Sequence, residues 1–189
     1  MGSSEELRDL IRETGAFDKS RHLVYFDRIW HRPDKLRICA DIIYQKLANI
    51  EEGLLKSGIN KANLVLLTAD SVEGNLGIVP MGFFIAEKLG WHMAIWKEYA
   101  DVRWGTSAIL GYREYNATCI LLQDVVDQGT IAIRIAQSIK TLSWKFAVYF
   151  SAVLNSENAD NGVNNSLDKA SLILGERPVF HYIISADEL

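Results

Sequence analysis

The sequence has few cysteines and no long hydrophobic run. Its two cysteines, Cys39 and Cys119, each lie within an apolar stretch. Isolated cysteines of this kind are typical of buried thiols in a reducing compartment, and they exclude a disulfide framework and a zinc site. No apolar run reaches the roughly 20 residues of a membrane span. Glu5, Glu6 and Asp9 stand where a secretory signal would carry positive charge. We therefore expect a cytoplasmic protein.

The sequence also lacks an excess of positive charge and the common catalytic motifs. It has 20 Lys and Arg against 24 Asp and Glu, a formal net charge of -4, which argues against a nucleic-acid-binding surface. A small polyanion is still possible as a ligand, because backbone N–H groups at a helix N-terminus can bind it. There is no Gly-x-Ser-x-Gly, no phosphate loop ending in Gly-Lys-Ser/Thr and no Cys-x-x-Cys. These absences exclude the common hydrolase, nucleotide triphosphatase and redox classes.

Short apolar segments alternate with amphipathic segments along the chain. The spacing of apolar residues predicts helices at 4–14, 33–57, 77–89 and 131–139, and strands at 22–26, 64–67, 92–96, 119–122, 146–150 and 178–184. Strands that are apolar throughout are typical of a parallel sheet with helices on both faces. Residues 98–116 predict a long loop or hairpin, and residues 155–166, rich in Asn, Ser, Asp and Gly, predict a surface loop. We therefore predict one α/β domain over residues 1–189, with its last strand at a sheet edge.

The segment from Cys119 to Ile131, CILLQDVVDQGTI, carries the most chemical information. A buried strand leads into Asp124, which at the strand's end would accept hydrogen bonds from ribose hydroxyls. The following turn and helix start offer N–H groups to a phosphate. Gly129 would let the backbone approach closely, and Thr130 would add a hydroxyl donor. The same residue types also occur where an Asp and a Gly only cap a strand and begin a helix, so both interpretations stay open at this point.

Asp124-Val125-Val126-Asp127-x-Gly129 resembles the phosphoribosyl-pyrophosphate (PRPP) loop of the type I phosphoribosyltransferases. It is similar to the acid-apolar-apolar-acid variant of the purine enzymes, in which the second acid sits beside the base. Other segments, in the same order, are similar to orotate phosphoribosyltransferase over residues 15–153: Gly15-Ala16-Phe17 with Tyr25-Phe26-Asp27, Gly77-Ile78-Val79-Pro80, and Lys97-Glu98 followed by Gly105 and Gly111.

The resemblance implies a fold, a reaction and a set of site residues. The fold would have a small N-terminal hood (1–33), a core (34–154) and a loop with a C-terminal strand (155–189). The reaction would join ribose 5-phosphate from PRPP to a nucleobase, with Mg²⁺ bound through PRPP and no dedicated metal site. PRPP contacts are expected from Gln123, Asp124, Val126, Asp127, Gln128, Gly129 and Thr130. Catalytic roles are expected of Asp124, Asp127 and Lys97. A loop that contacts the pyrophosphate is expected to contain Asp70, Ser71, Glu73 and Gly74. The resemblance also implies a homodimer.

Several residues depart from the family pattern. Gln123 replaces the first of two adjacent acids, Gln128 replaces a Thr of the phosphate turn, and Trp96 replaces an Arg before Lys97. Each change weakens affinity for a highly charged diphosphate. Three hypotheses follow: an orotate- or purine-type transferase, a catalytically impaired PRPP- or nucleotide-binding regulator, and a purely structural or dimerisation role.

Overall fold

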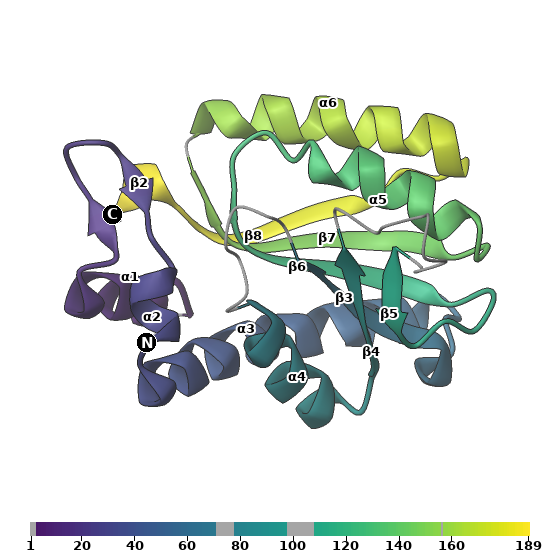
Figure 1. Cartoon of the computed structure of the whole chain (residues 1–189), viewed down its shortest axis with the longest axis horizontal. Helices are drawn as coiled ribbons and strands as arrows, with labels where there is room; N and C mark the ends of the chain where they lie inside the picture. The colour runs from purple at the N-terminus through teal and green to yellow at the C-terminus, as the bar shows by residue number, and fades with distance from the viewer. Residues whose placement is uncertain (1–2, 71–77, 98–107, 156) are drawn as a thin grey trace.

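A central sheet contains β3 (Leu64–Asp70), β4 (His92–Lys97), β5 (Ile109–Gly111), β6 (Thr118–Val126), β7 (Lys145–Leu154) and β8 (Val179–Ser185). The computed structural model describes residues 3–70, 78–97, 108–155 and 157–189. The strand order is β5-β4-β3-β6-β7-β8 (Figure 1). β5 pairs antiparallel with β4, and the other neighbours pair in parallel. The predicted α/β class with a mostly parallel sheet is confirmed, and β8 does lie at an edge.

Helices cover both faces of this sheet (Figure 1). They are α1 (Ser3–Thr14), α2 (Asp27–Trp30), α3 (Pro33–Lys56), α4 (Ile78–Leu89), α5 (Ile131–Lys140) and α6 (Glu157–Leu174). One apolar core joins α1, α3 and α4 to alternate residues of the strands, such as Leu66 and Ile120. A second core joins α5 and α6 to the intervening strand residues, such as Leu67 and Leu121. Strands buried on both sides are apolar throughout, which is why their sequences show no alternation.

Helix α3 illustrates how the sequence specifies its elements. Pro33 occupies the first helical turn, where its missing N–H leaves no hydrogen bond unmade. Leu36, Cys39, Ile43 and Leu47 are buried, and their spacing of three and four residues places them on one face. That face packs against the sheet and α4. The apolar spacing predicted the helix and its buried face.

Helix α4 lies unusually close to strand β3. A Cβ atom added at Gly82 would lie 2.7 Å from Thr68 Cγ2 and 2.8 Å from Met93 Cε. Any side chain at this position would push α4 away from the sheet, so the glycine permits the close approach.

Two predicted features differ in the structure. The segment predicted as a surface loop, 155–166, is mostly helix, because α6 begins at Glu157. Its burial of Ala159, Val163 and Leu167 against the second core outweighs the weak helix propensity of its Asn and Ser residues. Strand β6 extends to Val126, so Asp124 lies inside the strand and not at its end.

The hood, defined here as residues 3–30, contains α1, α2 and a small antiparallel sheet of β1 (Phe17–Asp18) and β2 (Leu23–Val24). The predicted opening strand, 22–26, is therefore shorter than expected. The hood lies beside the C-terminal end of the chain (Figure 1). His22 Nε2 lies 2.6 Å from Asp187 Oδ1, and Arg12 donates to the Leu189 carbonyl at 3.0 Å. The hood is thus held to the C-terminal end of the described chain.

Candidate functional site

Three predicted site residues lie in one row across the carboxyl edge of the sheet. Asp70, the last residue of β3, is in register with Lys97, the last residue of β4. Thr68 of β3 is in register with Leu122 of β6, so Asp124, two residues further on, is level with Asp70. In open α/β sheets, ligands bind at the carboxyl ends of the strands. The sheet therefore brings together residues that are far apart in sequence at the edge where a ligand is expected.

Asp124 is almost completely enclosed, with 3% of its surface exposed. The Val125 N–H donates to Asp124 Oδ1 at 2.8 Å. Burial raises the pKa of the Asp124 carboxyl to about 6, and the backbone hydrogen bonds offset this only in part. Among the described residues, no basic side chain contributes to that pKa. Above pH 6 the carboxylate is therefore charged with no described cation beside it, and it can accept hydrogen bonds from a ligand's hydroxyl groups.

Gln123 points to the other face of the sheet. The buried Tyr149 hydroxyl donates a hydrogen bond to Gln123 Oε1. Burial raises the pKa of Tyr149, so the phenol stays protonated and remains a donor. The side chain that stands in place of the family's first acid thus has a partner in the core between the sheet and α5.

Trp96 also has a structural role. It is 3% exposed, its indole N–H donates to Ser138 Oγ on α5 at 2.9 Å, and Arg134 lies 5.5 Å from the ring centroid. The residue that replaces the family's Arg is therefore a core anchor between β4 and α5. The neighbouring Lys97 is partly buried, and its N–H bonds to the Ala108 carbonyl at 2.7 Å. This bond and the antiparallel β5 agree with the hairpin predicted for 98–116, although 98–107 lie outside the described residues.

The turn from Asp127 to Thr130 connects β6 to α5. Asp127, Gln128 and Thr130 are exposed, whereas Val126 and Gly129 are buried. Gly129 has φ +64, and a Cβ atom there would lie 3.2 Å from Tyr149 Cε1. Within the described chain, the backbone N–H groups of residues 128–131 donate to no protein acceptor. The turn thus presents free donors at the positive end of the α5 dipole, as phosphate binding requires.

Ser71, Glu73 and Gly74 of the predicted pyrophosphate loop lie outside the described residues. Of Asp70, only the backbone position at the end of β3 is described. Among the described side chains, no group of three or more His, Cys, Asp or Glu is placed to hold a metal ion. No described helix is long and apolar enough to cross a membrane.

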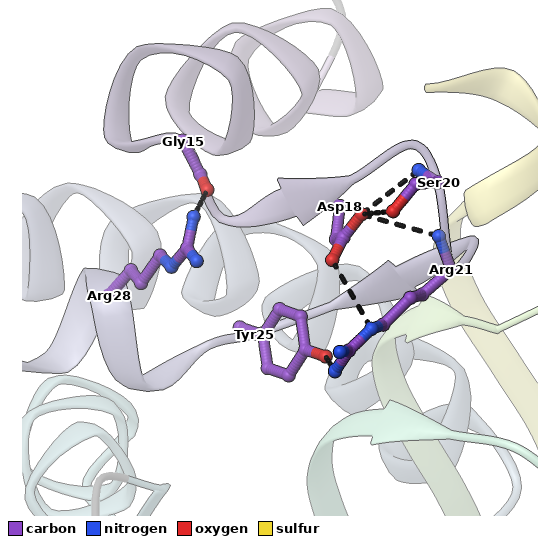
Figure 2. A network of polar contacts seen from close by, with 6 residues as sticks. All are labelled: Gly15, Asp18, Ser20, Arg21, Tyr25 and Arg28. Carbon is purple, nitrogen blue, oxygen red and sulfur yellow. Dashed lines mark hydrogen bonds and ion pairs between the residues drawn. The ribbon is translucent and has the colours of Figure 1, made fainter.

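Several polar residues of the hood bond to one another (Figure 2). Asp18 accepts hydrogen bonds from Ser20 Oγ and from the N–H groups of Ser20 and Arg21. The Ser20 hydroxyl is the main cause of a lowered Asp18 pKa. Arg21 lies 3.9 Å from Asp18 and 3.5 Å from the Tyr25 hydroxyl. Arg28, also drawn in Figure 2, donates to the Gly15 carbonyl. These contacts stabilise the turn between β1 and β2.

The sequence interpretation missed the contribution of α6 to the turn. Ser166 Oγ donates to the Gln128 carbonyl at 2.8 Å. The available signal was the apolar spacing of Ala159, Val163 and Leu167, which repeats every four residues as in a helix. The Asn- and Ser-rich composition of the segment obscured it.

Comparison with solved structures identifies the fold. The chain is similar to Leishmania donovani UMP synthase, with 16% identity and a TM-score of 0.68 over 99% of this chain and 37% of that one. The chain thus spans little more than a third of that protein's length. A Mycobacterium tuberculosis orotate phosphoribosyltransferase, in complex with inorganic phosphate, has 12% identity and a TM-score of 0.62, with 100% and 91% of the two chains covered.

A Trypanosoma brucei adenine phosphoribosyltransferase, in complex with AMP, pyrophosphate and ribose-5-phosphate, has 16% identity and a TM-score of 0.61, with 97% of this chain and 81% of that one covered. No protein-family model and no curated protein matches the sequence. At such low identity the likeness concerns the fold, and it agrees with the resemblance in the sequence motifs. The chain therefore has the fold of the type I phosphoribosyltransferases.

Proposed function

We propose that this protein is a phosphoribosyltransferase that transfers ribose 5-phosphate from PRPP to a nitrogenous base and releases pyrophosphate. The observation that supports this most is the turn at residues 127–130. Its free N–H groups follow β6 directly, at the same sheet edge as the row of Asp70, Lys97 and Asp124. N–H groups that can bind a phosphate, at the same sheet edge as a carboxylate that can accept hydrogen bonds from hydroxyl groups, suit a sugar phosphate.

Each residue has a role in this proposal. The backbone of residues 127–130 holds the 5-phosphate, with Gly129 allowing close approach and Thr130 adding its hydroxyl. Asp124 accepts hydrogen bonds from the ribose hydroxyls. Lys97 stabilises negative charge on the departing pyrophosphate. Asp127, exposed at the start of the turn, contacts the base.

The proposed reaction takes place at the anomeric carbon of the ribose. The bond from this carbon to the pyrophosphate oxygen breaks, and the pyrophosphate leaves with the bonding electrons. A bond forms from the same carbon to a ring nitrogen of the base, which loses its proton to a general base or to solvent. The protein contributes mainly by positioning the two reactants and stabilising the separating charges.

The described residues fit a magnesium ion that arrives with PRPP. Mg²⁺ usually keeps several waters and takes one or two protein carboxylates together with substrate phosphates. Asp70, the last residue of β3, would be the protein carboxylate beside such an ion, and the phosphates of PRPP would supply its other ligands. The ion would neutralise charge on the pyrophosphate group.

The hydrogen bond between Tyr149 and Gln123 supports a second candidate function. Gln123 stands where the transferase pattern has an acid, so the site has one acid fewer. Its side chain is also bonded to Tyr149 in the core. A catalytically impaired regulator that binds PRPP or a nucleotide would tolerate this loss. The base also stays open, because an orotate-like framework and the purine-like Asp127 point to different substrates. We include in the proposal the homodimer that the family resemblance implies.

Calorimetric titration with PRPP and Mg²⁺ tests the proposal, with Asp124→Ala as the variant and circular dichroism as the check of its folding. We expect the wild type to bind and the variant to lose binding. Pyrophosphate release is then measured with orotate, uracil, adenine, guanine and hypoxanthine. Release with one base supports the transferase, whereas binding without release on any base supports the regulator. A wild type that does not bind PRPP contradicts the transferase and leaves, of the regulator, only the form that binds a nucleotide.

A further inference from the structure

Helix α6 contacts the phosphate turn through its backbone as well as its side chains. A Cβ atom added at Gly162 would lie 3.3 Å from Gln128 Cα, and one added at Gly129 would lie 3.3 Å from Val163 Cα. The turn and the helix are thus packed so closely that a side chain at either glycine would be crowded. This contact joins residues about 35 positions apart along the sequence, and it holds the turn on one side.

The Ser166 hydroxyl makes the polar contact between these two elements. It donates to the Gln128 carbonyl at 2.8 Å, and Ser166 is 5% exposed. A serine inside a helix commonly bonds to a carbonyl of its own preceding turn. Ser171, one turn further along α6, does so with the Asp168 carbonyl at 2.7 Å. Ser166 instead bonds to the turn.

This hydrogen bond sets the orientation of one peptide group. The described chain contains no cis peptide bond, so the Gln128–Gly129 peptide is trans. In a trans peptide the carbonyl and the N–H point in opposite directions. Because Ser166 holds the Gln128 carbonyl toward α6, the Gly129 N–H points away from α6. That N–H has no acceptor within the described chain.

We infer that Ser166 is a positioning residue for phosphate binding: its hydroxyl fixes the Gln128–Gly129 peptide so that the Gly129 N–H is presented to a bound phosphate. The inference rests on the proposed function, in which this turn holds the 5-phosphate. Without the hydroxyl, the peptide can rotate, and the ligand must then order the turn as it binds.

The test compares Ser166→Ala with the matched control Ser171→Ala in calorimetric titrations with ribose 5-phosphate. We expect about a fivefold weaker affinity in Ser166→Ala, which corresponds to the loss of one hydrogen bond, and no change in Ser171→Ala. Thermal unfolding midpoints show whether either variant is folded. Equal affinities of the wild type and a folded Ser166→Ala overturn the inference while the proposed function stands. A wild type that does not bind ribose 5-phosphate contradicts the proposed function and, with it, the inference.

A spectroscopic measurement on the wild type provides a second test, which can overturn the inference even if Ser166→Ala does not fold. In ¹H–¹⁵N spectra recorded during titration with inorganic phosphate, the Gly129 amide proton should move downfield, because it donates to the anion. If other turn amides move while that of Gly129 does not, Ser166 does not present this group to phosphate, and the inference is wrong.

Discussion

Asp124 is a buried carboxyl group with no cation beside it among the side chains that the structure describes. It lies close enough to Cys39 of α3 to contribute to the raised pKa of that thiol. Its own pKa is raised to about 6 from an ordinary 3.8, mainly by burial. The folded chain therefore binds this proton more tightly than the unfolded chain does. The protonated Asp124 carboxyl therefore stabilises the folded chain relative to the charged form. This contribution to the free energy of unfolding is complete below about pH 4, and it is lost as the pH rises through about 6.

Asp124→Asn should be more stable than the wild type above pH 6, because the amide buries no charge. A pKa change of this size corresponds to at most about 3 kcal/mol, present at pH 8 and absent near pH 4. Urea unfolding of both proteins between pH 4 and pH 8 measures the difference. If the two free energies of unfolding stay parallel over this range, the carboxyl is not a destabilising charge in the folded protein.

Gly129→Ala should destabilise the protein, because the residue has φ +64 and a Cβ atom would lie 3.2 Å from Tyr149 Cε1. Backbone strain and crowding together should cost on the order of 1–3 kcal/mol. Gly53→Ala is the matched control, since nothing lies within 4 Å of its added Cβ in the last turn of α3. The free energy of unfolding of this control should rise by about 0.5–1 kcal/mol. Urea unfolding measures both changes, and a neutral Gly129→Ala would contradict the tight packing of the turn.

At the scale of elements, Trp96 and Ser138 join β4 to α5. Trp96→Phe removes the indole N–H, and Ser138→Ala removes its acceptor, so each should lower the free energy of unfolding by about 1 kcal/mol or more. Since both changes break the same hydrogen bond, we expect a coupling of about 1 kcal/mol in a double-mutant cycle measured by urea unfolding. If the effects of the two substitutions on the free energy of unfolding are strictly additive, the 2.9 Å hydrogen bond between Trp96 Nε1 and Ser138 Oγ contributes nothing to stability.

At the scale of the whole molecule, the hood is held to the C-terminal end of the chain by surface contacts. His22 bonds to Asp187 at 2.6 Å, and Arg8 lies 3.7 Å from Glu188. Exposed pairs of this kind stabilise weakly, typically by about 0–1 kcal/mol. The exposed part of the hood around residues 19–23 should therefore open locally more often than the sheet does.

Replacing His22 by Ala should accelerate hydrogen exchange in the hood without a large change in global stability. We expect faster exchange at residues 17–24 and unchanged exchange in β6 and β7, measured by mass spectrometry of peptic peptides. Ser171→Ala, at a site far from the hood in sequence and on the other side of the sheet, is the control. Unchanged exchange in the hood would mean that its apolar contacts alone, such as buried Leu7 and Ile11, hold it in place.

The sequence by itself determined the order of helices and strands, the parallel sheet and the family resemblance. Apolar periodicity reports which faces of a segment are buried, and that information is local. The strand at 119–122 and the helix at 131–139 were found in this way. The position of the turn between them followed from Gly129 and from the start of the helix, so the place of this turn was also predictable.

Tertiary structure alone decided what several side chains do. Gln123 and Trp96 differ from the family pattern, and the sequence alone indicates only that a charge is lost at each position. Their hydrogen-bond partners, Tyr149 and Ser138, lie 26 and 42 residues away along the chain. The helix at 157–174 forms because the second core buries its apolar face, although its Asn- and Ser-rich start favours a loop. Ser166 meets Gln128 only after both helices have packed on the same face of the sheet. These features depend on contacts between distant segments, which no local pattern of residues encodes.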